Sequence, residues 1–563
     1  MDKIWLKQYP PAVPAEINPA EYPSLNAVIA ESCERFRDLP AFTSMNRTIT
    51  YQQYERAAAS FAAWLQQVAG LQRGDRIAIM LPNVLQYPIA LYGALRAGLT
   101  VVNTNPLYTA RELEHQLTDS GASAIVVLEN FAHTLVKVIQ HTAIRRVIVT
   151  AVGDQLHWPV SGLVNFALRH IRKQVPPWDL PNAVRFNDVL QEGSYRQLHP
   201  VTVNHDDIAF LQYTGGTTGV AKGAMLTHRN MVANVLQAAS WIGTQAQLGI
   251  DVVVTPLPLY HIFALTANWL AFLKFGARNL LIANPRDFPA FLRELKRFRF
   301  TYISGVNTLF NALLNTPGFD SVDFSSLRIT LGGGMAVQRS VAERWKKVTG
   351  NVLTQAWGLT ETSPAVCINP FGKHDFNGSV GLPVSSTEIS VRDDEGLELA
   401  PGATGEICVR GPQVMKGYWQ RPDETAKVML PGDWLRTGDV GHVDAKGFVF
   451  LEDRKKDLIL VSGFNVYPNE VEEVAVTHPG VLEAAAVAED DEHSGEVVAL
   501  FVVRKDPNVT AQQIIDHSRT QLTGYKVPRH IYFRTELPKT NVGKILRREL
   551  RDELRKTAAP AAS

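Results

Sequence analysis

The sequence contains little cysteine and almost no net charge. Only three of its 563 residues are cysteines (Cys33, Cys367 and Cys408), and they form neither a CxxC pair nor another metal-ligand spacing. A disulfide framework and a cysteine-ligated zinc site are therefore not expected, and the reducing cytoplasm is the natural compartment. The formal net charge of +1 lacks the basic excess that is typical of proteins that bind nucleic acid.

The sequence also lacks an uninterrupted apolar run of membrane-spanning length. Two uncharged stretches, residues 77–95 and 252–273, come close, but prolines interrupt both of them. A spanning helix needs about 20 mostly apolar residues with paired backbone groups. Each stretch therefore favours a strand, a turn and a helix. The first residues hold no apolar h-region, so we expect no signal peptide.

Short apolar segments alternate with helical segments in the first part of the chain. Branched apolar runs predict strands at residues 75–81, 123–128, 146–151 and 279–283. Residues 85–98 are predicted to be helical. Such alternation is typical of parallel sheets covered by helices. After about residue 375, short alternating runs between Gly, Pro and Asp turns predict antiparallel strands, as at residues 388–392 and 405–410.

A smaller unit is expected from residue 453 onward. Its predicted strands are residues 458–461, 483–487 and 496–503, and its predicted helices begin at Pro468 and span residues 544–556. We therefore expect an α/β fold class with two domains. Residues 1–454 would form a large N-terminal domain of layered α/β sheets plus a β-rich subdomain. Residues 455–563 would form a small α+β C-terminal domain.

A loop rich in glycine and threonine, YTGGTTGVAKG at residues 213–223, is the strongest local signal. It follows a predicted strand at residues 207–212 and precedes a predicted helix at residues 228–241. Glycines let the backbone approach a ligand, and successive N–H groups can form an anion nest. The loop is not a Walker A motif, because Gly223 follows Lys222. It predicts a polyphosphate site, and a simple surface loop is the alternative.

Six further motifs follow in order along the chain. They are PLYHIFAL (258–265), GGGMAV (332–337), WGLTETSP (357–364), WLRTGD (434–439), DRKKDLILVSGFNVYPNEVE (453–472) and PKTNVGKILRREL (538–550). With the glycine-rich loop they resemble the adenylate-forming superfamily, which includes acyl-CoA synthetases, peptide-synthetase adenylation domains and beetle luciferases. Residues 434–461 also resemble the longer signature of fatty acyl-CoA synthetases.

The resemblance implies a two-step ligase. A long-chain fatty acid and ATP would give acyl-AMP and pyrophosphate, and coenzyme A would then displace AMP, with Mg²⁺ as cofactor. This would be the entry step of fatty-acid β-oxidation. The small domain would be mobile. The resemblance leaves open a peripheral contact of a cytoplasmic enzyme with the inner face of the cell membrane, and a homodimer.

The resemblance also assigns roles to individual residues. The nucleotide-binding residues would be Tyr213, Thr214, Gly215, Gly216, Thr217, Thr218, Gly219, Lys222, Gly333, Trp357, Thr360, Asp439 and Arg454. The catalytic residues would be Lys544, Thr218, Glu361 and Lys222. Two of them, Thr218 and Glu361, would hold the metal ion. The acyl pocket would include His261, Gly332 and Gly334. Lys456 would be the hinge, and Gly463 would border the tunnel for the pantetheine arm of coenzyme A.

Physical chemistry supports these roles. A carboxylate such as Asp439 can accept two hydrogen bonds from a ribose diol. A glutamate beside a triphosphate is a hard oxygen ligand for Mg²⁺. Attack of a carboxylate on the α-phosphorus brings two anions together, so Lys222 and Lys544 would meet the main catalytic need. Taken singly, Trp357 and His261 would fit a core, Asp439 a turn, and Lys544 the first turn of an exposed helix.

One motif departs from the family pattern. Close relatives usually have Glu-Gly-Tyr-Gly where this chain has QAWG at residues 355–358. Tryptophan keeps an aromatic face but loses the phenolic hydroxyl, and Gln355 removes a charge. Three other functions stay open at this point. They are a medium-chain or aryl acid–CoA ligase, an adenylation enzyme that loads a carrier protein, and a scaffold that binds nucleotide or lipid without catalysis.

Overall fold

The computed structural model describes residues 3–214, 221–372 and 375–558, and it confirms the predicted α/β class. One sheet has the strand order β7-β6-β5-β3-β4-β8-β9 and is parallel except for the β8–β9 pair. Its strands are β3 (Arg76–Met80), β4 (Thr100–Asn103), β5 (Ala124–Leu128), β6 (Arg146–Thr150), β7 (Val184–Arg185), β8 (Ile208–Thr214) and β9 (Lys222–Thr227). Strand β5 is buried along its whole length, as expected for a parallel strand with both faces covered.

A second, nine-stranded sheet has the order β16-β15-β14-β13-β12-β10-β11-β1-β2. Its strands are β1 (Pro40–Ser44), β2 (Arg47–Thr50), β10 (Val252–Thr255), β11 (Arg278–Leu281), β12 (Tyr302–Gly305), β13 (Ile329–Gly332), β14 (Leu353–Gly358), β15 (Ala365–Ile368) and β16 (Leu382–Pro383). The pairs from β1 through β14 are parallel. Thr214 at the end of β8, Gly333 just after β13 and Gly358 at the end of β14 line one cavity, and the carboxyl ends of strands are where open α/β sheets usually bind ligands.

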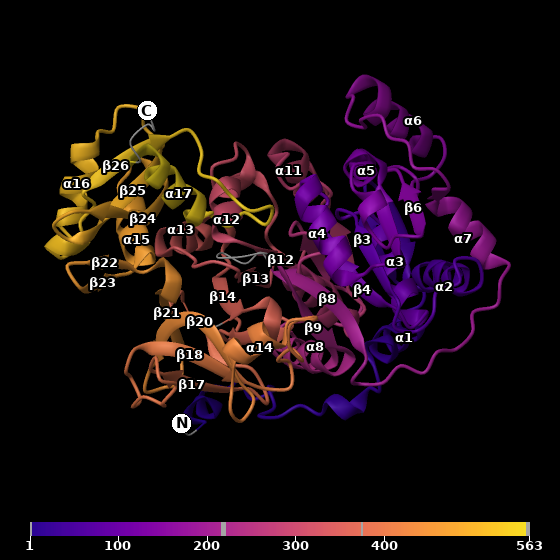
Figure 1. The fold of residues 1–563 in the computed structure, drawn as a ribbon, viewed down its shortest axis with the longest axis horizontal. Coiled ribbons are helices and arrows are strands. Elements are labelled where there is room, and N and C mark those ends of the chain that lie inside the picture. The colour runs from indigo at the N-terminus through magenta and orange to yellow at the C-terminus, as the bar shows by residue number, and fades with distance from the viewer. Residues whose placement is uncertain (1–2, 215–220, 373–374, 559–563) are drawn as a thin grey trace.

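Helices connect and cover these strands (Figure 1). They are α1 (Leu25–Arg35), α2 (Tyr51–Gln67), α3 (Gln86–Arg96), α4 (Ala110–Ser120), α5 (Glu129–Val136), α6 (Val160–Phe166), α7 (Phe186–Ser194), α8 (His228–Ile242), α9 (Ile262–Ala264), α10 (Ala271–Leu273), α11 (Phe288–Arg297), α12 (Asn307–Leu314), α13 (Arg339–Thr349) and α14 (Pro422–Val428). Capping boxes begin α2, α4 and α8. The two uncharged stretches form β3 with α3 and β10 with α9 and α10, as predicted.

The β-rich subdomain contains β17 (Glu388–Arg392), β18 (Gly405–Arg410), β19 (Met429–Leu430), β20 (Trp434–Val443) and β21 (Val449–Arg454). The C-terminal part contains β22 (Ile459–Val461), β23 (Phe464–Val466), β24 (Val481–Asp491), β25 (Gly495–Arg504), β26 (His530–Arg534), α15 (Pro468–Val476), α16 (Ala511–Arg519) and α17 (Arg547–Ala558). Figure 1 shows this part beside α12 and α13. Asn311 of α12 donates to the Leu482 carbonyl across this junction (3.2 Å).

Two predictions from the sequence need correction. Strand β9 lies between the glycine-rich loop and α8, so Lys222 begins a strand that pairs with β8 rather than ending a loop. Helix α17 begins at Arg547 and not at residue 544. Lys544 therefore lies on the loop before the helix, and the alternative of an exposed first helical turn is wrong.

Candidate active site

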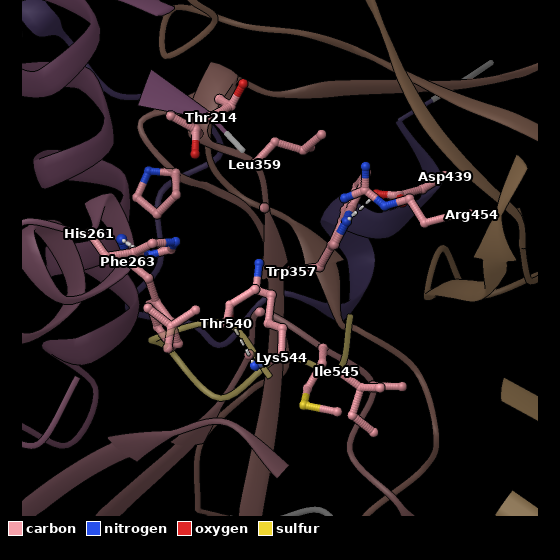
Figure 2. A pocket seen from close by; sticks show the side chains of 18 of the residues that line it. Thr214, His261, Phe263, Trp357, Leu359, Asp439, Arg454, Thr540, Lys544 and Ile545 are labelled. Carbon is pink, nitrogen blue, oxygen red and sulfur yellow. Dashed lines mark hydrogen bonds and ion pairs between the residues drawn. The ribbon is translucent and has the colours of Figure 1, made fainter. Parts of the chain in front are cut away.

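A cavity of about 1870 Å³ lies between the N-terminal sheets and the C-terminal part. Most of the predicted site residues that the structure describes line it: Tyr213, Thr214, Lys222, His261, Gly333, Gly334, Trp357, Thr360, Glu361, Asp439, Arg454, Lys456 and Lys544. Figure 2 shows His261 on one side of the cavity, Asp439 and Arg454 on the other, and Lys544 reaching in from its loop. Motifs more than 300 residues apart in the sequence therefore meet at one site.

Asp439 lies on β20 and is only 5% exposed. The indole Nε1 of Trp357 donates to its Oδ2 (2.9 Å), and Nε of Arg454 lies 2.6 Å from its Oδ1. Burial raises the pKa of Asp439, and the charge of Arg454 opposes that rise. Since a carboxylate has about four acceptor sites, two remain for further donors. The residue is thus a buried, oriented acceptor, and the interpretation as a simple turn aspartate does not fit.

The tryptophan at position 357, where the family usually has tyrosine, makes a hydrogen bond of its own in the site. The residue lies on β14, is 8% exposed and lines the cavity. Its N–H group holds one oxygen of Asp439, so the tryptophan supplies a donor as well as an aromatic ring. Gln355 is used differently, because its side chain accepts from the Val337 N–H (3.1 Å) and donates to the Ser379 carbonyl (3.0 Å). Gln355 therefore braces the loop after β13.

The Lys544 loop is held against the N-terminal domain. Gly543 has φ +89°, and a Cβ there would lie 2.9 Å from Thr308 Oγ1, so this position requires glycine. Thr308 Oγ1 donates to the Gly543 carbonyl (2.9 Å), and the backbone N–H of Lys544 donates to Thr540 Oγ1 (3.1 Å). Burial lowers the pKa of Lys544 to about 8. The loop therefore places a titratable ammonium group inside the cavity.

A second cation, Lys222, also lines the cavity. Lys222 forms an ion pair with Glu424 of α14, and its Nζ lies 5.1 Å from the ring centre of Tyr418. The Tyr418 hydroxyl donates to Oε1 of Glu361 (2.7 Å), which orients that carboxylate. Our reading of the sequence missed Tyr418 and Glu424. The only local signal was Pro422, which marks the start of a helix and not a function.

His261 lies at the N-cap of α9, where its Nδ1 accepts from the Phe263 N–H (3.3 Å). Burial, together with the nearby charge of Lys544, lowers the pKa of His261 to about 3, so the imidazole is neutral. It lines the cavity while making a local cap. His261 is half-buried at the cavity wall rather than enclosed in the core, and its role in an acyl pocket stays a prediction.

Of the remaining predicted residues, some line the cavity and others do not. Gly332 does not line the cavity, because it is buried where a Cβ would meet Leu353 and Val337. Gly463 lies in the exposed turn between β22 and β23 with φ +85°, also away from the cavity. Lys456 lines the cavity, and burial lowers its pKa to about 8. The predictions for Gly215, Gly216, Thr217, Thr218 and Gly219 lie outside the described residues.

An apolar extension of the cavity was not predictable from any motif. Its walls include side chains that also belong to one hydrophobic cluster: Ala238, Ile242, Ala267, Leu331, Ile368 and Phe371. These residues come from α8, the π-helical segment after α9, β13, β15 and the loop after β15. The cavity therefore joins a polar end, with Asp439 and the two lysines, to an apolar end inside the N-terminal domain.

Within the described residues, no group of three or more His, Cys, Asp or Glu side chains is arranged to hold a metal ion by itself. Glu361 nevertheless fits Mg²⁺, which is usually bound through one or two carboxylates together with substrate phosphates. Its carboxylate lines the cavity and is oriented by Tyr418. In the same part of the chain, no helix is long and apolar enough to cross a membrane.

Comparisons with known proteins agree with this geometry. The family model of the AMP-binding enzymes matches residues 29–419, and that of their C-terminal domain matches residues 470–544. The chain is 56% identical to a long-chain-fatty-acid–CoA ligase of Escherichia coli O157:H7 over 99% of both chains. It is 50% identical to the Haemophilus influenzae enzyme of the same name, over 98% of this chain and 99% of that one.

A solved structure gives the same fold. The anthranilate CoA ligase AuaEII in complex with anthranoyl-AMP has a TM-score of 0.85 and 24% identity, over 97% of this chain and all of that one. At this identity the likeness supports the arrangement of the two domains rather than the substrate. Together with the two family models, these matches show that the chain belongs to the family of AMP-binding enzymes.

Proposed function

We propose that this protein is a long-chain-fatty-acid–CoA ligase that forms AMP. The observation that carries the proposal is the continuous cavity, which joins a buried aspartate and a loop lysine to an apolar extension. The full-length relatives with 50–56% identity carry this name, which favours it over an aryl or medium-chain acid ligase. The polar end suits ATP and the apolar end suits an alkyl chain.

In the first step, a carboxylate oxygen of the fatty acid attacks the α-phosphorus of ATP. A new P–O bond forms, the bond to the β-phosphate oxygen breaks, and pyrophosphate leaves. Asp439 would accept hydrogen bonds from both ribose hydroxyls through its unused lone pairs. Trp357 and Arg454 fix the orientation of the Asp439 carboxylate. Lys544, when protonated, would stabilise the charge that develops at the α-phosphate.

Lys222 would bind the β- and γ-phosphates, which leave as pyrophosphate. For this role it must exchange the carboxylate of Glu424 for phosphate oxygens, because the two side chains are paired in this structure. Glu361, oriented by Tyr418, would hold Mg²⁺ together with the phosphates. The bound ion would supply charge neutralisation at the triphosphate. Thr218 is proposed as a second ligand from the family pattern.

In the second step, the sulfur of coenzyme A attacks the acyl carbonyl, the thioester forms and AMP leaves. The side chain of Lys544 lies next to Gly334 in this structure: a Cβ added to Gly334 would lie 3.2 Å from Lys544 Cε. We propose that the C-terminal domain turns about Lys456 after adenylation. The turn would remove Lys544 and bring Gly463 toward the pantetheine arm. This proposal places the domain boundary at residues 454 and 455.

A chain-length series of kcat/KM values tests the substrate. Each methylene that enters the apolar extension adds about 0.8 kcal/mol, or about fourfold, until the extension is full. We expect kcat/KM to rise in this way from octanoate to acids with 14 or more carbons. A maximum at acetate, benzoate or octanoate would refute the long-chain assignment.

We further propose that the enzyme takes its substrate from a membrane surface and supplies acyl-CoA to β-oxidation. Long-chain fatty acids partition into bilayers, because each methylene favours an apolar environment. The enzyme would therefore act as a peripheral protein at the inner face of the cell membrane. A homodimer remains a prediction, which sedimentation velocity would test.

A further inference from the structure

An inverted amphipathic segment lies at the outer edge of the N-terminal domain. It comprises residues 157–174, including α6 and the π-helical residues Ala167–Ile171. Figure 1 shows α6 projecting beyond α5 at the periphery of the molecule. The large apolar side chains of this segment face solvent: Trp158 (88% exposed), Val160 (47%), Leu163 (65%), Phe166 (56%) and Ile171 (71%).

The polar side chains of the segment attach it to the protein. Asn165 is the buried residue of α6, where it accepts from the Gly153 N–H (2.8 Å) and donates to Asp154 Oδ1 (3.0 Å). One turn later, Arg169 forms a bidentate pair with buried Glu129 at 2.9 and 2.7 Å. Residues spaced i and i+4 share a helix face. The side chains that bond the segment to the protein are therefore polar and lie beside half-buried Val164 and Leu168, while its most exposed large side chains are apolar, the reverse of an ordinary surface helix.

The charge of the segment has one sign. The sequence contains no aspartate or glutamate between Asp154 and Asp179, although the whole chain is nearly neutral. Arg172 and Lys173 are exposed at the C-terminal end of the segment, and neither forms an ion pair that the structure records. Helices with an exposed apolar face, aromatic residues and flanking basic residues are typical of those that lie in the interface of an anionic bilayer.

We propose that residues 157–174 dock on the surface of an anionic lipid bilayer. The apolar outer face enters the boundary between headgroups and acyl chains, and Arg172 and Lys173 contact the lipid phosphates. The bidentate pair and the Asn165 contacts hold the segment in place, so docking needs little ordering of the chain. The choice of lipid as partner rests on the proposed long-chain substrate, since the same bilayer would hold that acid.

Vesicle co-sedimentation of the full-length protein tests this surface. Vesicles of phosphatidylcholine alone would be compared with vesicles that contain about 30% phosphatidylglycerol, at low and physiological salt. We expect binding to the anionic vesicles that weakens as salt rises. The double variant Leu163→Glu/Phe166→Glu should lower the partition coefficient by at least about tenfold, because it removes two apolar groups and adds negative charge. Arg172→Glu/Lys173→Glu should weaken binding to anionic vesicles alone.

Matched controls separate this surface from general effects of charge. Leu397 is 67% exposed but lies in the β17–β18 hairpin of another subdomain, so Leu397→Glu should bind vesicles like the parent. Lys446→Glu/Lys505→Glu, at two exposed lysines outside the segment, is the control for the basic pair. Formation of acyl-CoA from detergent-solubilised oleate should be unchanged in all variants, which would also show that they are folded.

The outcomes are distinguishable. Equal vesicle binding by the parent and Leu163→Glu/Phe166→Glu overturns the proposal. Equal binding to neutral and anionic vesicles overturns the role of the basic residues. A parent dimer that Leu163→Glu/Phe166→Glu dissociates, without vesicle binding, makes the segment a self-association surface instead. Failure of the parent to form acyl-CoA from solubilised oleate refutes the proposed function, whatever the vesicles show.

Discussion

Replacement of Trp357 by phenylalanine isolates the role of the indole N–H group. Phenylalanine keeps an aromatic ring but removes the hydrogen bond to Asp439 Oδ2 (2.9 Å). The acceptor is a buried carboxylate, 5% exposed, and hydrogen bonds to charged groups contribute about 1.5–3 kcal/mol. We therefore expect kcat/KM for ATP to fall by about 10- to 150-fold, mostly through KM, because the ribose contact exists before and during the reaction.

The pH dependence of this variant gives a more specific result. Burial raises the pKa of Asp439, and the hydrogen bond from Trp357 opposes part of that rise. Removing the donor therefore raises the pKa further, and the carboxylate becomes protonated at a higher pH. The acid limb of kcat/KM for ATP should move to higher pH in Trp357→Phe. Its position reports the free enzyme, where Asp439 has no ribose partner.

The family resemblance also implies that the ring of Trp357 stacks on adenine, and analogues of the nucleotide separate that role from the orientation of Asp439. The parent enzyme should prefer ATP to 2′-deoxy-ATP and 3′-deoxy-ATP, because Asp439 accepts from both hydroxyls. Trp357→Phe should lose part of this preference, while a loss of stacking alone would weaken all three nucleotides equally. Trp357→Tyr, which carries the usual residue of the family, is the matched control. Unchanged preference together with an unchanged acid limb in Trp357→Phe would refute the positioning role.

Three further predictions concern the cations of the site. Lys456→Pro should keep pyrophosphate exchange but lose most thioester formation, since proline fixes φ near −65° at the proposed hinge; equal loss of both would argue against a hinge there. Glu424→Gln should lower KM for ATP several-fold by releasing Lys222 from its ion pair, and a higher KM would show that Glu424 instead assists binding. Adenylation kcat/KM should decline as pH rises through about 8, where Lys544 loses its proton in the free enzyme, and a flat profile to pH 10 would contradict this.

Much of the fold follows from local sequence patterns. The runs at residues 123–128 and 146–151 became β5 and β6 because buried parallel strands are apolar throughout. The six residues of strand β9 were not predicted to be a strand, because Gly223 and the glycine-rich sequence before it are typical of a loop. The predicted start of α17 was too early, because Gly543 and a bridge between Lys539 and Ile545 keep the Lys544 loop in a tight turn before the helix begins at Arg547. Glycine residues and pairing between distant segments therefore account for both errors, the missed strand β9 and the early start of α17.

The site was predictable as a set of motifs but not as a set of contacts. The motifs placed Trp357, Asp439 and Lys544 in one region, and they do line one cavity. The hydrogen bond between Trp357 and Asp439 joins strands 82 residues apart, and no local pattern indicates it. The same holds for Tyr418 and Glu361, which are 57 residues apart. Such pairs depend on how the β-rich subdomain packs against the sheets, so their catalytic roles stay predictions.

The most direct test of the account is a pair of half-reactions on Lys544→Ala. The loop places this lysine in the cavity in the present domain arrangement, beside Gly334 and away from Gly463. Pyrophosphate exchange with oleate and ATP measures adenylation, and acyl-CoA formation from synthetic oleoyl-AMP measures the second step. We predict that adenylation falls by about 10² or more, while thioester formation is largely kept. An equal fall in both half-reactions would contradict the alternation of the C-terminal domain.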